Sequence, residues 1–116
     1  MSHIKRFWLV IGIAIVAILL IGLPQYKAMI VKSRETTLEL NLSSIREVIR
    51  QYTKDKQSPP RSLQDLVDAG YFRELPIDPI TNSNSSWRPV VENTVLTDLH
   101  SGATGTSSKG TEYSAW

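Results

Sequence analysis

An uncharged apolar run near the N-terminus constrains this chain more than any other feature of its sequence. Residues from Phe7 to Tyr26 include no charged side chain. An apolar stretch of about 20 residues is long enough to cross the hydrocarbon layer of a membrane. No loop signal separates this run from the charged, amphipathic stretch that continues to about Lys54. We therefore expect one long helix, with one half in lipid and the other in water.

A cleaved signal peptide is the alternative interpretation of the run. A signal of that kind needs small residues spaced as in Ala-x-Ala after its apolar core, and residues 20–24 do not supply them. An uncleaved anchor is favoured. Basic residues lie on both sides, with Lys5 and Arg6 before the run and Lys27 after it, so the positive-inside count does not decide the orientation. We place the N-terminus in the cytoplasm because the segment before the run is too short to be the functional domain.

Pro24 lies about where the helix should leave the bilayer. A proline removes one backbone donor, and its ring crowds the preceding turn, so we expect a kink or local melting. Pro24 could instead start a separate second helix. A continuous helix is favoured because the next residues, 25–29, contain no loop punctuation.

The amphipathic half carries one apolar stripe. Steps of four and three align five apolar residues along the stripe: Leu38, Leu42, Ile45, Ile49 and Tyr52. Two heptads are too few to argue for a coiled coil, so the favoured interpretation is a helix covered by its own head. Polar residues between these positions, Arg46 among them, are expected to face water or neighbouring chains.

A second, short helix is expected after the helix-breaking Pro59 and Pro60. Ser62 with Asp65 three residues later has the form of a capping box, and Gly70 fits the position that closes a helix. Farther on, Trp87 to Glu92 and Val95 to His100 have the pattern of two strands. They are separated by Asn93 and Thr94 as a two-residue hairpin connection. Five aromatic residues are expected to pack the head: Tyr71, Phe72, Trp87, Tyr113 and Trp116.

These elements predict an α+β fold in which a long N-terminal helix, half transmembrane and half amphipathic, packs on a small head. The predicted divisions are 1–26 for the N-terminal tail and transmembrane helix, 27–56 for the amphipathic half, and 57–116 for the head with its C-terminal loop. At 116 residues there is room for only one modest domain outside the membrane. The chain has no cysteine, so packing, an ion or other subunits must stabilise the head.

Composition argues against nucleic acid as a partner. The net charge of +2 comes from Lys5 and Arg6, and both signs are interspersed along the rest of the chain. An enzyme is also disfavoured. Asp98, His100 and Ser101 could suggest a hydrolytic trio, but neighbouring side chains on one strand point to opposite faces. No catalytic or cofactor-binding residue is therefore assigned.

The order of these features resembles the major pseudopilin of bacterial type II secretion, a member of the type IV pilin-like superfamily with, in this chain, an atypical N-terminus. The matching segments cover nearly the whole chain: Leu23-Pro24-Gln25-Tyr26, Asn41-Leu42, Ile45-Arg46, Ile49-Arg50-Gln51-Tyr52, Asp55-Lys56-Gln57-Ser58-Pro59-Pro60, Ser62-Leu63-Gln64-Asp65-Leu66-Val67, Gly70-Tyr71-Phe72, Leu75-Pro76-Ile77-Asp78-Pro79-Ile80-Thr81, Ser86-Trp87, Asp98-Leu99-His100-Ser101-Gly102 and Gly110-Thr111-Glu112-Tyr113-Ser114-Ala115-Trp116.

The resemblance implies a non-enzymatic subunit, anchored once in the bacterial inner membrane with its head in the periplasm. Such subunits pack helix to helix into a short fibre that serves protein export. The implied partners are membrane lipid, further copies of the chain, minor pseudopilins and the inner-membrane secretion platform. The implied assembly positions lie on the long helix: Phe7, Pro24, Tyr26, Leu38, Leu42, Ile45, Ile49 and Tyr52.

The N-terminus departs from the family pattern. Members have a Gly-Phe cleavage point followed by Thr-Leu-Ile-Glu, and the glutamate guides docking. Aligned on Pro24, the phenylalanine position falls on His3 and the glutamate position on Phe7. A monomeric, membrane-tethered binding module with the same fold but no fibre assembly is therefore the alternative function.

The family's C-terminal loop commonly binds calcium, which needs six to eight oxygen ligands, normally with several carboxylates. Between Ser101 and Thr111 this chain has no acid, and Lys109 stands where relatives often place an aspartate. Asp98 is the remaining calcium candidate, although a strand-end role is favoured for it. We expect no cofactor, and the Lys109 ammonium to lie where the cation would sit and to donate to the same carbonyls.

Overall fold

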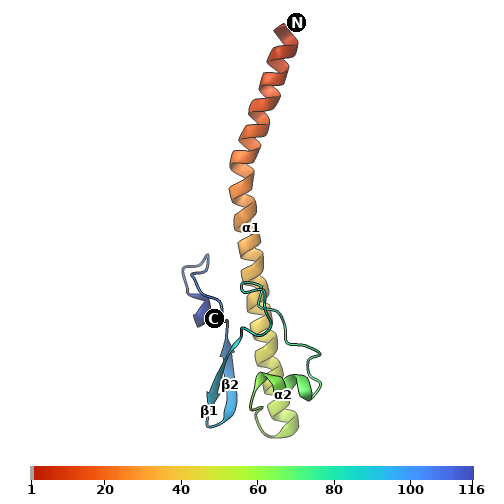
Figure 1. The fold of residues 1–116 in the computed structure, drawn as a ribbon, viewed down its shortest axis with the longest axis vertical. Coiled ribbons are helices and arrows are strands. Elements are labelled where there is room, and N and C mark those ends of the chain that lie inside the picture. Colours follow the sequence, from red (N-terminus) through yellow and green to blue (C-terminus); the bar gives the residue numbers. More distant parts are fainter. Residues whose placement is uncertain (1) are drawn as a thin grey trace. The chain divides into compact units, whose positions relative to one another are not determined.

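The computed structural model describes residues 2–116, so Met1, the first residue of the predicted 1–26 segment, lies outside it. Five elements follow one another along the chain (Figure 1): α1 (Ser2–Lys56), α2 (Leu63–Asp68), β1 (Arg88–Glu92), β2 (Val95–His100) and the 3₁₀ helix η1 (Tyr113–Ala115). The prediction of an α+β chain with one long helix, one short helix and an antiparallel hairpin is confirmed.

The chain forms two compact units, Met1–Ser33 and Arg34–Trp116. We call them the N-terminal unit and the head unit. α1 contributes its first half to the N-terminal unit and its second half to the head unit. The head unit therefore contains its own length of long helix, with α2, the hairpin and the C-terminal residues packed on it.

α1 continues without a break through Pro24. The favoured prediction of a continuous helix is confirmed, whereas the local melting expected there and the alternative in which Pro24 starts a separate helix are wrong. A proline costs a helix one backbone hydrogen bond. Its neighbours Leu23, Gln25, Ala28 and Met29 are good helix formers, which favour continuation on both sides. The helix ends at Lys56, and the following Gln57 adopts a left-handed conformation with φ of 55°.

The core of the head unit forms where α1 presents its apolar stripe to the head. Leu38, Leu42 and Ile45 are each at most 2% exposed, and Ile49 is 7% exposed. Residues from the other elements complete this core: Leu63, Leu66, Trp87, Leu96, Leu99, Ala103 and Tyr113. Burying a leucine or isoleucine side chain contributes about 1.5–3 kcal/mol, so the stripe is the main attachment of α1 to the head.

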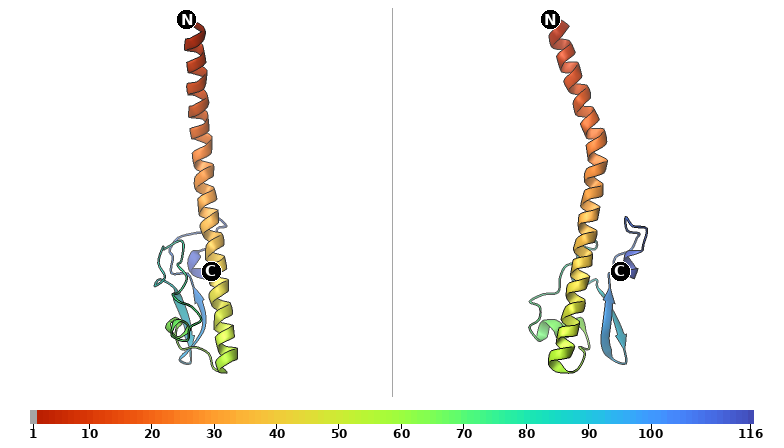
Figure 2. Two further views of the ribbon diagram at one scale, coloured as in Figure 1. Left: turned by 90° about the vertical axis from the view of Figure 1, so that its right-hand side faces the viewer. Right: turned by 180° about the vertical axis from the view of Figure 1, so that it is seen from behind.

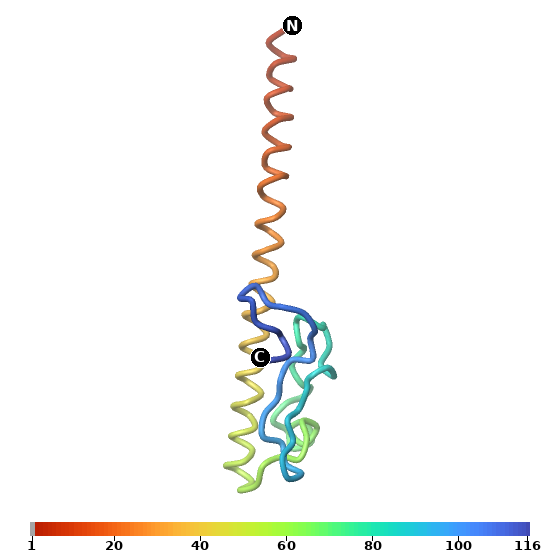
Figure 3. Tube along the Cα trace, turned by 90° about the vertical axis from the view of Figure 1, so that its left-hand side faces the viewer, coloured from red at the N-terminus to blue at the C-terminus, as the bar shows by residue number. Residues whose placement is uncertain are grey.

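All head elements lie on one side of α1. Figure 2 (left) and Figure 3 show α2, the hairpin and the C-terminal residues together on that side. On the uncovered side Leu40 is 65% exposed, although Leu38 and Leu42, two positions before and after it, are buried. One long face of this part of α1 therefore stays open to solvent or to another molecule.

α2 is short and begins at the predicted cap. The Ser62 hydroxyl accepts from the Asp65 backbone N–H at 3.3 Å, and the Asp65 carboxylate accepts from the Arg61 N–H at 2.9 Å. Gly70 then adopts φ of 87°, in the left-handed region that closes a helix. The turn after α2 is fixed to the end of α1, since the Tyr71 hydroxyl donates to Asp55 at 2.6 Å.

The hairpin turns at the predicted two residues. Asn93 and Thr94 both have positive φ, 51° and 65°, as a type I′ connection requires. β1 and β2 pair antiparallel with a shift in register between Val90 and Val91. Leu96 and Leu99 of β2 point into the core, whereas β1 is mostly exposed. β2 therefore carries the hairpin's contacts with the core.

Candidate functional site

The apolar run lies within the N-terminal unit, on the exposed surface of α1. Except for Ile11, every large apolar side chain from Ile4 to Met29 is more than half exposed. In the part of the chain that the structure describes, α1 is the one helix long and apolar enough to cross a membrane. Exposed apolar surface on this scale marks a membrane or an interface.

The ends of the run carry aromatic residues of the kind found at membrane surfaces. Trp8 lies at one end, beside Phe7 with ring centroids 6.2 Å apart, and Tyr26 lies at the other. The helix rises through 18 residue steps from Trp8 to Tyr26, about 27 Å, which is close to the thickness of the hydrocarbon layer. Tryptophan and tyrosine are enriched at both membrane surfaces, so the two ends fit a single crossing.

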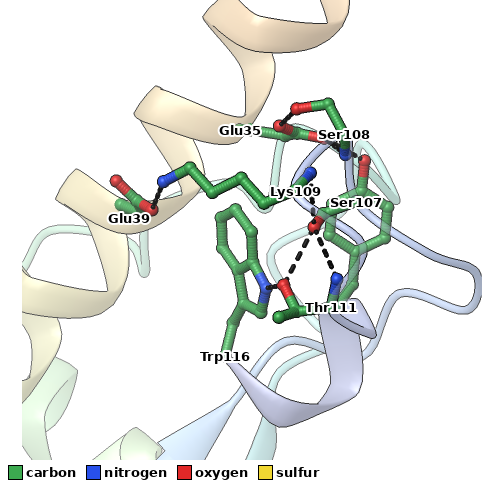
Figure 4. Close-up of polar contacts among 8 residues, drawn as sticks. Glu35, Glu39, Ser107, Ser108, Lys109, Thr111 and Trp116 are labelled. Atoms are coloured by element: carbon green, nitrogen blue, oxygen red, sulfur yellow. Dashed lines mark hydrogen bonds and ion pairs between the residues drawn. The ribbon is translucent and has the colours of Figure 1, made fainter.

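A buried carboxylate lies where the C-terminal residues meet α1 in the head unit. We call residues 105–116 the C-terminal strap. Glu35 on α1 is only 3% exposed, and its carboxylate accepts from the Ser108 backbone N–H at 2.7 Å, from the Ser108 hydroxyl and from the Tyr113 hydroxyl at 2.8 Å. Figure 4 shows this carboxylate facing the strap. Three donors therefore satisfy one buried charge.

The surroundings of Glu35 keep it ionised. Burial alone would raise the pKa of this carboxyl group, because it disfavours the charged form. The hydrogen bonds from Ser108 and Tyr113, together with the positive charge of Lys109, outweigh burial and hold the pKa below its ordinary value of 4.5. The same contact acts on the partner, since burial and the bond to Glu35 raise the pKa of Tyr113.

The contacts of the Lys109 ammonium differ from those that the sequence predicts. Its ammonium donates to the Glu39 carboxylate at 3.0 Å and lies 5.8 Å from the centroid of the Trp116 ring (Figure 4). The expectation that it donates to loop carbonyls is wrong, because Glu39, 70 positions away, offers a charged acceptor that the loop lacks. Both side chains of this pair are at least half exposed, so it contributes little to stability.

A groove of about 410 Å³ lies beside the strap in the head unit. Leu42, Ser43 and Arg46 of α1 line it together with residues of the strap. The indole N–H of Trp116 donates to the Thr111 hydroxyl at 2.9 Å, and the Tyr113 and Trp116 rings meet edge to face, 5.6 Å apart. The strap thus forms one wall of the groove and is held by its own aromatic residues.

The carboxylate of Asp98, the calcium candidate, is paired with an arginine side chain. Arg46, expected to face water or other chains, donates from Nε to Asp98 at 2.8 Å and from a terminal nitrogen to the Leu99 carbonyl at 2.9 Å. Burial raises the pKa of Asp98, but the Arg46 contact and the Leu99 backbone N–H hold it below its ordinary value. Within residues 2–116 no group of three or more His, Cys, Asp or Glu side chains gathers as metal ligands do.

The possible hydrolytic trio is not assembled. Besides Asp98, which pairs with Arg46, His100 Nδ1 lies 2.6 Å from the Trp116 backbone oxygen. The Ser101 hydroxyl donates to Asp78, which is completely buried and also accepts from the Ile80 N–H at 2.9 Å. Each member of the trio serves a different contact within the head.

The structure gathers some of the residues singled out in the sequence and separates others. Leu38, Leu42, Ile45 and Ile49 meet Trp87 and Tyr113 in one core, with Tyr52, Phe72 and Trp116 packed against it. Tyr71 lies against Tyr52 with ring centroids 5.6 Å apart. The remaining positions, Phe7, Pro24 and Tyr26, belong to the N-terminal unit.

Glu35 is the residue that the sequence reasoning missed. It lies three positions before Leu38 and so continues the spacing of the apolar stripe, which was the available signal. A charged residue at a core-facing position is expected to be paired or hydrogen-bonded, and the serine and tyrosine of the strap provide those bonds.

Comparisons of the chain with protein-family models, with curated proteins and with solved structures gave no match. The function therefore has to be argued from the geometry of the chain itself and from the resemblance of its sequence pattern.

Proposed function

We propose that this chain is a membrane-anchored pseudopilin subunit that assembles through its N-terminal helix into a short periplasmic fibre for type II protein secretion. The observation that carries the proposal is the composition of α1. One unbroken helix joins an exposed apolar segment of membrane-spanning length to a part covered by the head on one side only. In this account the subunit is non-enzymatic and single-pass, with its head in the periplasm.

The open face of α1 in the head unit supports assembly. Leu40 is 65% exposed on a helix whose opposite side is buried, and the head leaves that face uncovered. A helix can leave lipid for a fibre only if packing against other helices replaces its contacts with lipid tails, and identical subunits supply such packing in symmetric assemblies. Further copies of the chain, minor pseudopilins and the inner-membrane secretion platform are the proposed partners.

A second candidate function is a monomeric, membrane-tethered binding module with the same architecture. Its specific support is the start of α1, whose first turn contains no acidic residue and whose sixth residue, Phe7, stands where the resemblance calls for a glutamate. Without that charge the subunit lacks one contact that would guide docking on a growing fibre.

Disulfide crosslinking in native membranes distinguishes the two functions. The chain has no cysteine of its own, so introduced cysteines report only on the chosen positions. Ala28→Cys and Leu40→Cys together place two thiols on exposed parts of α1. The fibre predicts a ladder of crosslinked multimers that requires the secretion motor. A matched pair on the head loops, Ser85→Cys with Arg61→Cys, controls for random collision. Monomer under all conditions would leave only the tethered module.

A further inference from the structure

Polar contacts attach the C-terminal strap to α1 within the head unit. Residues of the strap bond to one another, with the Tyr113 N–H donating to the Gly105 carbonyl at 3.1 Å and the Ser107 N–H to the Thr111 carbonyl at 2.7 Å. These bonds shape the strap but do not hold it on the helix. The strap is linked to α1 through Glu35 and through the exposed pair of Lys109 with Glu39.

Of these two links, the one through Glu35 is buried and the other is not. Glu35 is 3% exposed, and its three hydrogen bonds come from residues 73 and 78 positions away. Hydrogen bonds to a charged acceptor are about twice as strong as neutral ones. The Lys109 pair is exposed to solvent and screened by salt. Glu35 is therefore the stronger of these two polar attachments of the strap.

We propose that Glu35 is an internal anionic ligand that latches the C-terminal strap onto α1, and that protonation of its carboxylate releases the strap while the hairpin and α2 stay folded. A protonated carboxyl group has one oxygen that must donate, whereas both Ser108 groups and the Tyr113 hydroxyl approach as donors. Protonation thus removes the negative charge that strengthens all three bonds, and a hydroxyl group keeps its contact with the new O–H only by turning to accept. This latch does not depend on the proposed function in secretion.

The charged groups around Glu35 set the direction of the response to pH. Lys109 faces it from the strap and favours the ionised form, while Glu39 lies one turn along α1 and is itself neutralised by Lys109. Because the pKa of Glu35 in the folded chain is below 4.5, the latch is closed at neutral pH. It opens as the pH falls through that lowered pKa.

Hydrogen exchange on the full chain in detergent micelles tests the latch. At pH 7 we compare the wild type with Glu35→Gln, which keeps the size of the side chain but not its charge. The expected result is at least a tenfold loss of protection in peptides covering 105–116, with less than a twofold change in those covering 88–100. Glu39→Gln, which removes the exposed pair, is the matched control and should change protection of the strap less than twofold.

Two further arms make the test decisive. In the wild type, protection of the strap relative to intrinsic exchange should fall selectively as the pH drops below 4.5. A chelator at pH 7 should have no effect, since a carboxylate and not an ion holds the strap. A protected strap in Glu35→Gln, an equal loss of protection throughout the head, or a loss caused by the chelator would each overturn the proposal.

Discussion

The hydroxyl group of Tyr113 donates to the carboxylate of Glu35 at 2.8 Å, which joins two residues 78 positions apart. Tyr113→Phe keeps the ring and its edge-to-face contact with Trp116 but removes this donor. Because the bond ends on a charged, buried acceptor, we expect the free energy of unfolding to fall by about 1–3 kcal/mol. Urea unfolding of the full chain in micelles, followed by tryptophan fluorescence, measures it.

Tyr71→Phe is the matched control for that variant. The Tyr71 hydroxyl also donates to a carboxylate, that of Asp55 at 2.6 Å, but this bond lies at the surface. Exposed polar contacts contribute little, so the loss should be below about 1 kcal/mol. An equal loss in both variants would contradict the distinction drawn between the buried and the exposed carboxylate.

The pairing of Asp98 with Arg46 predicts a dependence of stability on pH. The pKa of Asp98 is lower in the folded chain than its ordinary value of 3.8, so the contact stabilises the fold above that value. Its contribution is lost as the pH falls through the lowered pKa. The unfolding free energy of the wild type minus that of Asp98→Asn should be constant above about pH 5 and shrink in stronger acid. A difference that grows in acid would contradict this assignment.

Gly102 has no room for a side chain. A Cβ atom at this position would lie 1.8 Å from the Ser86 carbonyl oxygen. Overpacking of this kind costs about 1–3 kcal/mol or more, so Gly102→Ala should strongly lower the melting temperature of the head. Gly70→Ala is the control, since it meets nothing within 4 Å and bears only the cost of its φ of 87°. A smaller effect at Gly102 than at Gly70 would refute the close contact.

Thr94 is strained by its place in the hairpin turn. A β-branched residue rarely adopts a positive φ, and here φ is 65°. Thr94→Gly removes that strain, and we expect it to stabilise the head by about 1 kcal/mol. Thr104 is exposed and does not have a positive φ. Thr104→Gly should therefore destabilise the head slightly, because glycine adds conformational freedom to the unfolded chain. Thermal unfolding of both variants checks the contrast.

Local signals in the sequence were enough to predict α1, α2 and the hairpin, but not η1. Ser62, Gly70 and the pair Asn93-Thr94 each mark a boundary through their own backbone or capping chemistry, and the structure places helix and strand ends there. The stripe beginning at Leu38 predicted which side of α1 is buried. The lack of loop punctuation after Pro24 correctly predicted a continuous helix, because one lost hydrogen bond does not outweigh good helix formers on both sides.

The contacts of the strap could not be predicted in the same way. Glu35 and Ser108 are 73 positions apart, and Lys109 and Glu39 are 70 apart, so no spacing rule relates them. The loop of residues 101–111 has no acid, so the sequence predicts that Lys109 donates to carbonyl groups within the loop. The fold places Glu35 and Glu39 of α1 beside the strap. Their carboxylates accept hydrogen bonds from Ser108 and Lys109 of the strap.

The proposed function requires residues 7–26 of α1 to cross the inner membrane and the head to lie in the periplasm. Single cysteines at Ser2, Ile18 and Ser85, treated with a membrane-impermeant maleimide, test it in cells whose outer membrane has been permeabilised. We predict rapid labelling at Ser85, labelling at Ser2 only after the inner membrane is also opened, and no labelling at Ile18 until the protein is denatured. Labelling of Ile18 as fast as Ser85 in intact inner membranes would contradict the account.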